Sequence, residues 1–515
     1  MEERLSAEKA EAESLRNGHQ RGILSQRVDA SETIAKRSRL SLLLVVLAVG
    51  GFYLATVREG HIWGDDFSMY IHHAKNIAEG VSYDQTGYIY NPSLAVLGPR
   101  TYPPVFPLML APVYIWAGGS LTAMKVMIFL SFLLFIVMIF LAFRHDLPWL
   151  YLLTLIVLIG FNPFLWQFKD NIVSDIPFLL FVYLSLFLIS RAYSSERKGR
   201  RRALDVILIA LSIYLAYGTR SIGLVLLPSL LVYDLIKNKR PTVFAIIITL
   251  VTSALVAVQG LFLHDDRSYV GQLAINPKAT IPQVWEYISE FSSIWAQGSN
   301  KGFRLGLFVM MFALAFIGYL ARIKDRITIF EVFTIFYLLP LLVLTMPVDV
   351  RFLLPIMPLY LFYAFLGIQF ISRSSEREIA ALSMVVIALF IAYATRYLKL
   401  DYGPIREGVA KIETQLLFEY VKRETSVNDV FIFRKPRAFA LFTDRRASAW
   451  HRPPDDQELW NYFERIQANY LVLGPKDLEP DDQEYLRGFI ERHKEKFQET
   501  YVNADFQVYH VVMRM

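Results

Sequence analysis

Apolar runs long enough to cross a lipid bilayer recur between residues 40 and 397, and the charged residues of this region lie between the runs. A hydrocarbon core of about 30 Å requires about 20 predominantly apolar residues of helix, and only elements that satisfy their own backbone hydrogen bonds fit there. The chain has 515 residues, 54% of them hydrophobic. We therefore predict a mainly α protein, a polytopic transmembrane helix bundle of about 11 to 13 spans.

Positively charged loops set the expected orientation of the bundle. Basic residues before the first span and in four later short loops are predicted to face the cytoplasm, because short loops follow the positive-inside rule. They lie at 36–39, 191–202, 237–240, 322–326 and 373–377. We expect a multi-pass protein of the inner (plasma) membrane, with a cytoplasmic tail or helix at 1–39.

The same orientation places the first loop, 59–102, and everything after 398 on the exoplasmic (periplasmic) side. One part of the scheme stays open. The chain is predicted to be outside at 60 and at 175, which requires an even number of crossings, yet three apolar blocks lie between these points. The blocks are 103–118, 120–143 and 149–168. Either one of them is re-entrant, or the third, which is broken at Asn162–Pro163, folds back as two half-spans.

The composition changes after residue 398, where charged residues become frequent and short β-rich runs alternate with amphipathic helical ones. The predicted strands are 430–434, 445–450, 470–474 and 506–513, and the predicted helices lie near 404–424, 455–468 and 481–497. We expect a transmembrane domain at 40–397, with a catalytic first loop, and a small exoplasmic α/β domain at 398–515.

The charge balance excludes little, but the cysteine count excludes several kinds of site. The 53 Lys and Arg residues exceed the 47 Asp and Glu residues, for a net charge of +6. In a membrane protein such an excess reflects orientation, so no nucleic-acid partner is predicted. The absence of cysteine excludes a disulfide framework, a thiolate nucleophile and any cysteine-ligated metal site.

An acidic pair, Asp65 and Asp66, opens the first exoplasmic loop directly after a span. Carboxylates at this place are costly unless they are solvated or used. An ionised aspartate is suited to act as the general base that takes a proton from an acceptor hydroxyl, which contributes about 10²–10⁴-fold to a rate. The alternative is that one aspartate N-caps a helix expected at 67–79. Both roles are compatible, with one residue capping and the other acting.

Tyr70 and His73 fall on the same face of this helix as Asp66, at i+4 and i+7. A metal site formed by Asp66, His72 or His73 is one interpretation of the spacing. We favour an interfacial helix with solvated histidines, so no metal ligand is assigned and a divalent metal ion stays an open alternative. A second acidic pair, Asp265-Asp266, also follows a span and rivals the first.

Three further polar residues are expected on the exoplasmic side. Asp175 starts a span, Arg220 lies at a hairpin tip and Arg351 opens another span. Two arginines at such places are suited to bind the phosphate of a lipid carrier and to stabilise its charge as it leaves. The alternative is that they snorkel to lipid headgroups, or pair with Asp175 or Asp349.

Four segments follow the first loop in a fixed order. They are YPPVFPLML, NPFLWQFKDNIVSDIPFLLF, YGTRSIGLVLLP and RFLLPIMPLY. With the acidic pair, they resemble the GT-C superfamily of glycosyltransferases, and most closely the bacterial protein O-mannosyltransferase and aminoarabinose-transferase branch. The resemblance, which covers roughly residues 40–400, implies an inverting transferase that uses a polyprenyl-phosphate sugar. It assigns the base to Asp65, with Asp66 as its neighbour, and implies that Asp175 and Arg351 line the same cavity.

The chain departs from the aminoarabinose type just before the Pro-Pro pair. Related enzymes carry an acidic residue and a lysine there, whereas this chain has Thr101 and Tyr102 before Pro103-Pro104. A metal ligand and a phosphate-binding lysine are therefore missing, and we expect Arg100 to substitute for the cation. Tyr102 ends a tyrosine-rich stretch whose rings suit sugar stacking, although tyrosine is also an ordinary residue of membrane interfaces.

The sequence predicts a membrane glycosyltransferase that moves a sugar from a polyprenyl-phosphate-linked donor to an exoplasmic acceptor, which is a cell-envelope glycan, a lipid or a protein. The expected partners are this donor and membrane lipid. A transporter or flippase of lipid-linked sugars is the main alternative, and a non-catalytic scaffold is a third. Carriers tend to place polar residues near the bilayer midplane, whereas here they cluster at span ends on one side.

Overall fold

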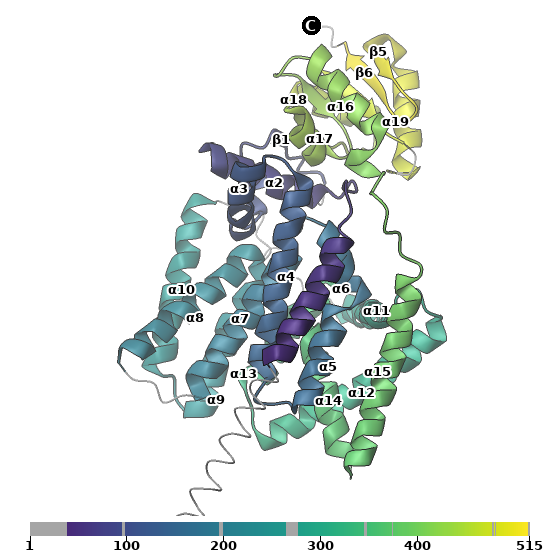
Figure 1. The fold of residues 1–515 in the computed structure, drawn as a ribbon. Coiled ribbons are helices and arrows are strands. Elements are labelled where there is room, and N and C mark those ends of the chain that lie inside the picture. The colour runs from purple at the N-terminus through teal and green to yellow at the C-terminus, as the bar shows by residue number, and fades with distance from the viewer. Residues whose placement is uncertain are drawn as a thin grey trace, which may run out of the picture.

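The protein is a bundle of helices with an α/β domain seated on one end, as the computed structural model in Figure 1 shows. The structure describes residues 39–512 except 95–97, 195–198, 264–276, 344–347, 373, 476–477 and 479. The tail at 1–38 and the acidic pair at 265–266 lie outside the described residues. We call the end that carries the α/β domain the capped end, and the other the open end.

The bundle confirms the prediction of a mainly α, polytopic membrane fold. Within the described ranges, nine segments are long and apolar enough to cross a membrane, and three shorter apolar helices accompany them. Some of these segments consist of more than one helix. Apart from α3, which is described below, the helices of the bundle are Arg39–Ala55, α4 (Leu121–Phe143), α5 (Trp149–Gly160), α6 (Pro163–Gln167), α7 (Asp175–Ser194), α8 (Arg200–Thr219), α9 (Leu226–Asn238), α10 (Val243–Phe262), α11 (Pro277–Ala296), α12 (Lys301–Asp325), α13 (Ile329–Val343), α14 (Met357–Ile371) and α15 (Ser375–Tyr397).

Burial separates inner helices from outer ones. Most of the spanning part of α7 and α14 is buried inside the bundle, whereas most of α10, α12 and α15 is exposed. The exposed side chains on the outer helices are large and apolar, as on α10 at Leu250 and Phe262. Apolar surface of this kind is stable against lipid tails, so the outer helices fit a bilayer environment.

One of the three apolar blocks between 103 and 168 forms a helix too short to span a bilayer. The first block forms α3 (Val105–Ala117), about 20 Å of helix at 1.5 Å per residue, which is too short for a hydrocarbon core of about 30 Å. Val105 packs on Gly218 near the capped end of α8, and Tyr114 interacts with Glu79 of α2 at the same end. The chain then runs from the capped end to the open end through α4 and comes back through α5 and α6, a path that agrees with the expected even number of crossings.

The α/β domain contains a six-stranded sheet with the order β1-β3-β2-β4-β6-β5. Pairs β1–β3, β3–β2 and β2–β4 are parallel, and β4–β6 and β6–β5 are antiparallel. The elements are β2 (Val430–Ile432), β3 (Arg446–Ser448), β4 (Tyr470–Leu473), β5 (Phe497–Val502) and β6 (Gln507–Val511), with α16 (Ile412–Glu424), α17 (Pro436–Thr443), α18 (Asp456–Ile466) and α19 (Pro480–Arg492). The four predicted strands are present; β5 and α17 were not predicted.

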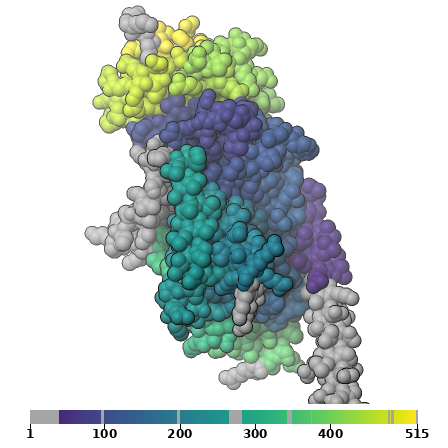
Figure 2. Space-filling model, turned by 90° about the vertical axis from the view of Figure 1, so that its left-hand side faces the viewer, coloured from purple at the N-terminus to yellow at the C-terminus, as the bar shows by residue number. Residues whose placement is uncertain are grey.

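The edge strand β1 (Tyr88–Ile89) comes from the first loop and pairs in parallel with Ala447 and Ser448 of β3. The sequence did not predict this pairing. In Figure 2 the α/β domain lies directly on the first loop, and α10 reaches the loop from below. The loop and the domain are therefore joined through one sheet.

The chain that leaves α15 is fixed to the start of the first loop by backbone contacts. Ile405 N–H donates to the Glu59 carbonyl at 2.8 Å, and Val409 N–H donates to the His61 carbonyl at 3.2 Å. Gly408 has a φ of +68°, and a Cβ there would lie 2.6 Å from the backbone that follows His61. Only glycine fits this backbone conformation and this close contact, so Gly408 allows the chain that leads to the α/β domain to pack directly on the first loop.

Candidate active site

The acidic pair lies in the first turn of α2 (Asp65–Glu79), an amphipathic helix at the capped end. Gly64 is the N-cap residue, and no side chain caps the helix. The predicted capping by an aspartate is therefore wrong, because the helix begins earlier than 67. Two carboxylates in the first turn still favour the helix through its dipole.

Asp65 and Asp66 point in different directions. Asp65 is directed toward α17, where the backbone N–H of Ala438 donates to it. Burial raises the pKa of Asp65, and the cationic side chains of Arg437 and Lys435 oppose this rise only in part. Asp65 thus belongs to the contact between α2 and the α/β domain.

Asp66 instead lies between two arginines and a tyrosine. Its Oδ1 accepts a hydrogen bond from the Tyr102 hydroxyl at 2.7 Å and lies 3.3 Å from Nη1 of Arg437. Its Oδ2 lies 3.8 Å from Nη1 of Arg351. The Asp66 side chain keeps 39% of its exposure, so this carboxylate is accessible to a ligand.

Arg351 links Asp66 to two further carboxylates. Its Nη1 lies 3.8 Å from Oδ2 of Asp175, and its Nε donates to Oδ2 of Asp349 at 2.6 Å. Asp349 also accepts from the Arg351 backbone N–H at 2.9 Å, which fixes the arginine at the start of its span. Asp175 is almost fully buried and is paired with Arg220.

These contacts bring residues from six parts of the chain together at the capped end. We call them the acid–guanidinium cluster, which consists of Asp66, Tyr102, Asp175, Arg220, Asp349, Arg351 and Arg437. Tyr70 supports it from below: its hydroxyl lies 3.0 Å from Oγ of Ser174, and its ring packs edge-on against the Tyr102 ring, with centroids 5.2 Å apart. Fork-shaped guanidinium groups near an accessible carboxylate can bind a phosphate and hold a base beside it.

Four predicted site residues lie outside the cluster: Asp65 and Tyr70, described above, and Arg100 and His73. Arg100 is paired with Asp84, with 2.7 Å between Arg100 Nε and Asp84 Oδ2. His73 is buried and stacked on Tyr83, and its Nδ1 lies 2.7 Å from the Tyr83 carbonyl oxygen. Burial lowers the pKa of His73 to about 3 and that of His72 to about 4, so both are neutral at physiological pH.

The predicted solvated histidines are therefore wrong, because α2 turns this face toward α3 and the loop rather than toward water. In the part of the chain that the structure describes, no three His, Cys, Asp or Glu residues are grouped so as to hold a metal ion.

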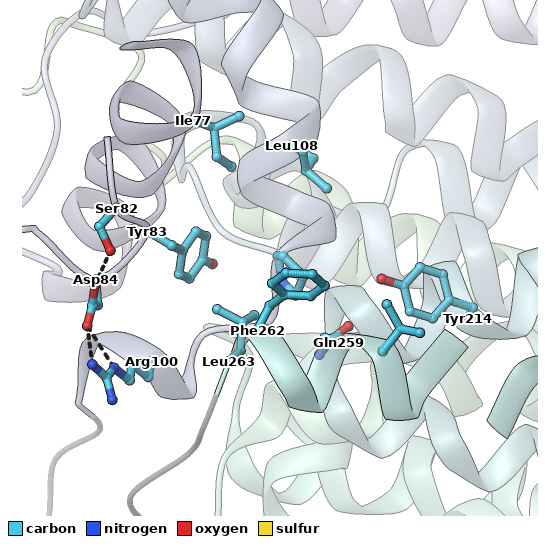
Figure 3. Close-up of a pocket in the computed structure, with 12 residues that line it drawn as sticks. Ile77, Ser82, Tyr83, Asp84, Arg100, Leu108, Tyr214, Gln259, Phe262 and Leu263 are labelled. Atoms are coloured by element: carbon cyan, nitrogen blue, oxygen red, sulfur yellow. Dashed lines mark hydrogen bonds and ion pairs between the residues drawn. The ribbon is translucent and has the colours of Figure 1, made fainter. Parts of the chain in front are cut away.

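A cavity of about 650 Å³ lies beside the cluster, between the first loop and the ends of α8 and α10 (Figure 3). Its rim is polar, with Ser82, Asp84 and Arg100, and its wall is apolar, with Leu108 and Phe262 among others. The cavity therefore combines a charged rim with a surface suited to hydrocarbon.

Tyr83 connects this cavity to Tyr102 of the cluster. The Tyr83 ring lines the cavity, and the Tyr83 hydroxyl donates to the Tyr102 carbonyl at 2.8 Å. The Tyr102 hydroxyl, on the other side, donates to Asp66. The cavity and the Asp66 carboxylate are thus linked through two hydrogen bonds.

Arg437 is the site residue that sequence reasoning missed. It lies in the segment FRKPRAFALF, where Pro436 begins α17 and the neighbouring residues Ala438 and Phe439 are buried. A cation in the buried part of a short helix is costly unless it is paired, and this is the signal that would have singled it out. Its partners are in the first loop, and no local pattern identifies them.

The fold is similar to that of solved membrane glycosyltransferases. ArnT from Cupriavidus metallidurans bound to undecaprenyl phosphate matches with a TM-score of 0.59 at 12% identity, over 91% of this chain and 97% of that chain. An Archaeoglobus fulgidus oligosaccharyltransferase in complex with Zn and sulfate matches with a TM-score of 0.60 at 12% identity, over 91% and 72%. AglB from the same organism, with an inhibitory peptide and a dolichol-phosphate, gives 0.56 at 11%, over 84% and 69%.

These proteins are GT-C glycosyltransferases, and ArnT is an aminoarabinose transferase, so the predicted resemblance to the GT-C superfamily is confirmed. At such low identities the similarity establishes the fold, and the activity has to be argued from the site. No protein-family model matches the chain, and no curated protein sequence matches it.

Proposed function

We propose that the protein is an inverting glycosyltransferase that transfers a sugar from a polyprenyl-phosphate-linked donor to an exoplasmic acceptor. The observation that carries the proposal is the accessible Asp66 carboxylate held beside Arg351 at one end of a GT-C-like bundle. In this proposal the capped end is exoplasmic, the N-terminus is cytoplasmic and the protein lies in the plasma membrane. The acceptor is a cell-envelope glycan, a lipid or a protein.

The proposed chemistry requires a base and a cationic site for the leaving group. Asp66 takes the proton of the acceptor hydroxyl as its oxygen bonds to the anomeric carbon, on the face opposite the phosphate. The bond between that carbon and the phosphate oxygen breaks, and the phosphate departs as an anion, so no strong acid is needed. Arg351 and Arg220 stabilise its developing charge, and the configuration at the carbon inverts.

The geometry favours Asp66 over Asp65 as the base. The family resemblance assigns this role to Asp65, but Asp65 is directed into the contact with α17 and its pKa is raised by burial. Asp66 is more accessible and lies next to the guanidinium groups. Two neighbouring carboxylates therefore divide the tasks: Asp65 contributes to the contact with the α/β domain, and Asp66 reacts.

The position of the cluster favours chemistry over transport of a headgroup. A carrier needs polar residues near the bilayer midplane to move its cargo, whereas the acid–guanidinium cluster lies at the capped end, against the α/β domain. The neighbouring cavity, with its polar rim and apolar wall, suits an amphipathic lipid substrate.

The test uses the purified full-length protein with a panel of polyprenyl-phosphate-linked sugars and a cell-envelope extract as acceptor. Release of polyprenyl phosphate and transfer of labelled sugar with inverted linkage are the expected results. Asp66→Asn should lower turnover by about 10²–10⁴-fold, and the matched Asp65→Asn variant should lower it far less. Failure of the wild-type protein to consume any donor would reject the function, and wild-type turnover of Asp66→Asn would reject the base.

A further inference from the structure

We propose that Arg437 of the α/β domain is a positioning residue that holds Asp66 and Tyr102 in place, so that the active site is complete only when the domain is docked. The inference rests on the proposed function and goes beyond it, because it assigns part of the active site to a domain outside the membrane bundle.

The contacts of Arg437 form a closed triangle with the other two residues. Arg437 Nη1 donates to the Tyr102 hydroxyl oxygen at 2.6 Å and lies 3.3 Å from Oδ1 of Asp66. The Tyr102 hydroxyl donates to the same Oδ1 at 2.7 Å. The three residues come from different parts of the chain: Arg437 from α17, Tyr102 from the loop before α3, and Asp66 from the first turn of α2.

The direction of these hydrogen bonds follows from what each group can donate. A guanidinium group has donors only, so the Tyr102 oxygen must accept from Arg437. The single hydroxyl proton of Tyr102 is then left to point at Asp66. Arg437 therefore orients the tyrosine, and the two together fix Oδ1 of the carboxylate. Oδ2 remains on the side of Arg351, at 3.8 Å, where the acceptor proton would be taken.

Arg437 is a buried charge at the contact between the α/β domain and the first loop. The side chain is only 3% exposed. The rings of Tyr88 and Tyr102 lie 5.2 and 5.5 Å from its guanidinium carbon, within the range of a cation–π contact. A buried arginine is expensive unless it is paired; both carboxylates of the acidic pair act on its charge, and the one in hydrogen-bond range is Asp66, the proposed base.

The rival explanation is that Arg437 only attaches the domain to the first loop. The domain already has other attachments, since β1 pairs with β3 and Val409 N–H donates to the His61 carbonyl. Arg445 provides a matched control in the same domain. It is buried to a similar degree, and it binds backbone carbonyls of Lys422, Thr425 and Thr443 within the domain.

The first measurement compares kinetic constants of Arg437→Met, Tyr102→Phe and the double variant with the polyprenyl-phosphate sugar that the wild-type protein consumes. We expect each single change to lower kcat by about 10- to 100-fold with little change in the donor KM, because the base is displaced and not removed. The double variant should be no slower than the slower single variant, since both act through one carboxylate. Arg437→Lys, which keeps the charge, should recover part of kcat.

Arg445→Met should leave kcat of the folded protein near the wild-type value while lowering the melting temperature. Multiplicative losses in the double variant, or a wild-type kcat in Arg437→Met, would overturn the inference while leaving the proposed function intact.

A second measurement needs no substrate. Asp66 is labelled with a water-soluble carbodiimide, and the rate is followed by mass spectrometry of the full-length protein. Release of Oδ1 in Arg437→Met should change the labelling rate of Asp66 several-fold, whereas Arg445→Met should not change it. Equal rates in all three proteins would contradict the positioning role even if the wild-type protein consumed no donor.

Discussion

The two ends of the bundle each carry a network of charged residues, and the networks differ in how much of their central charges is exposed. At the open end, Arg322 Nη2 donates to Oδ1 of Asp146 at 2.5 Å, and its Nε lies 3.8 Å from Oε1 of Glu331. Glu331 also accepts from Thr328 and from the Tyr363 hydroxyl. These contacts tie together the α4–α5 turn, α12, α13 and α14.

The central charges of the open-end network are almost fully buried and have their partners within the chain. In the acid–guanidinium cluster, Asp66 and Arg351 keep about a third of their side-chain exposure. The difference indicates a division of work. A network whose charges are buried against one another stabilises the fold, whereas one with accessible charged groups is available to a ligand.

The largest expected effect is on stability at the open end. Arg322→Ala leaves Asp146 and Glu331 buried with less compensation, which should lower the free energy of unfolding by about 3–5 kcal/mol. Turnover per folded molecule should stay near the wild-type value. The control is Arg326→Ala, which removes a half-exposed partner of Asp146 and should cost less than about 1 kcal/mol. Equal losses in the two variants would refute the distinction.

The next effect is on activity at the capped end. Arg351→Ala should raise the donor KM by about 10- to 100-fold, which corresponds to the loss of a hydrogen bond to a charged group. Its melting temperature should change little, because its contacts are partly solvated. Steady-state kinetics and thermal unfolding of the same sample check both expectations. A lower melting temperature with an unchanged KM would make this arginine a structural residue.

A smaller effect is expected on the pH dependence of stability, which should be stronger at the capped end than at the open end. Burial lowers the pKa of His73 to about 3 from its ordinary 6.5, so the unfolded chain takes up a proton that the folded chain excludes. Stability is therefore full above pH 6.5 and falls as the pH drops toward 3, by about 2 kcal/mol at pH 5.

Hydrogen exchange of α2 should accelerate between pH 7 and pH 5, after correction for intrinsic rates, more than exchange of α12 and α13. His73→Gln should reduce this difference, since glutamine does not titrate. If α2 and the open-end helices lose protection equally, the histidine is not the cause.

The smallest effect is expected at Arg100. Its ion pair with Asp84 is substantially exposed, and exposed pairs contribute about 0.2–1 kcal/mol. Arg100→Ala should change the free energy of unfolding by no more than this. A loss in donor affinity as large as that of Arg351→Ala would extend the phosphate site from the cluster to the neighbouring cavity.

The sequence predicted the bundle well because hydropathy is a local property that length and charge placement reveal. It also correctly predicted that four site residues lie at the same end of the bundle, because helix ends on the same side of a membrane lie at the same height. These residues are Asp66, Asp175, Arg220 and Arg351. It did not predict which carboxylate of the pair faces the arginines. That choice depends on the docking of α17, and Arg437 is 371 residues away from Asp66 in the chain.

The shared sheet sets an order of events during synthesis. Ile89 and Ser448, which are bonded in the folded protein, are separated by 359 residues. A ribosome delivers the first of these strands early and the second only after the last helix has entered the membrane. The strand from the first loop must therefore wait outside the bilayer without its partner. Until Arg437 has been synthesised, the nascent chain holds Asp66 without this arginine, and the proposed active site is incomplete.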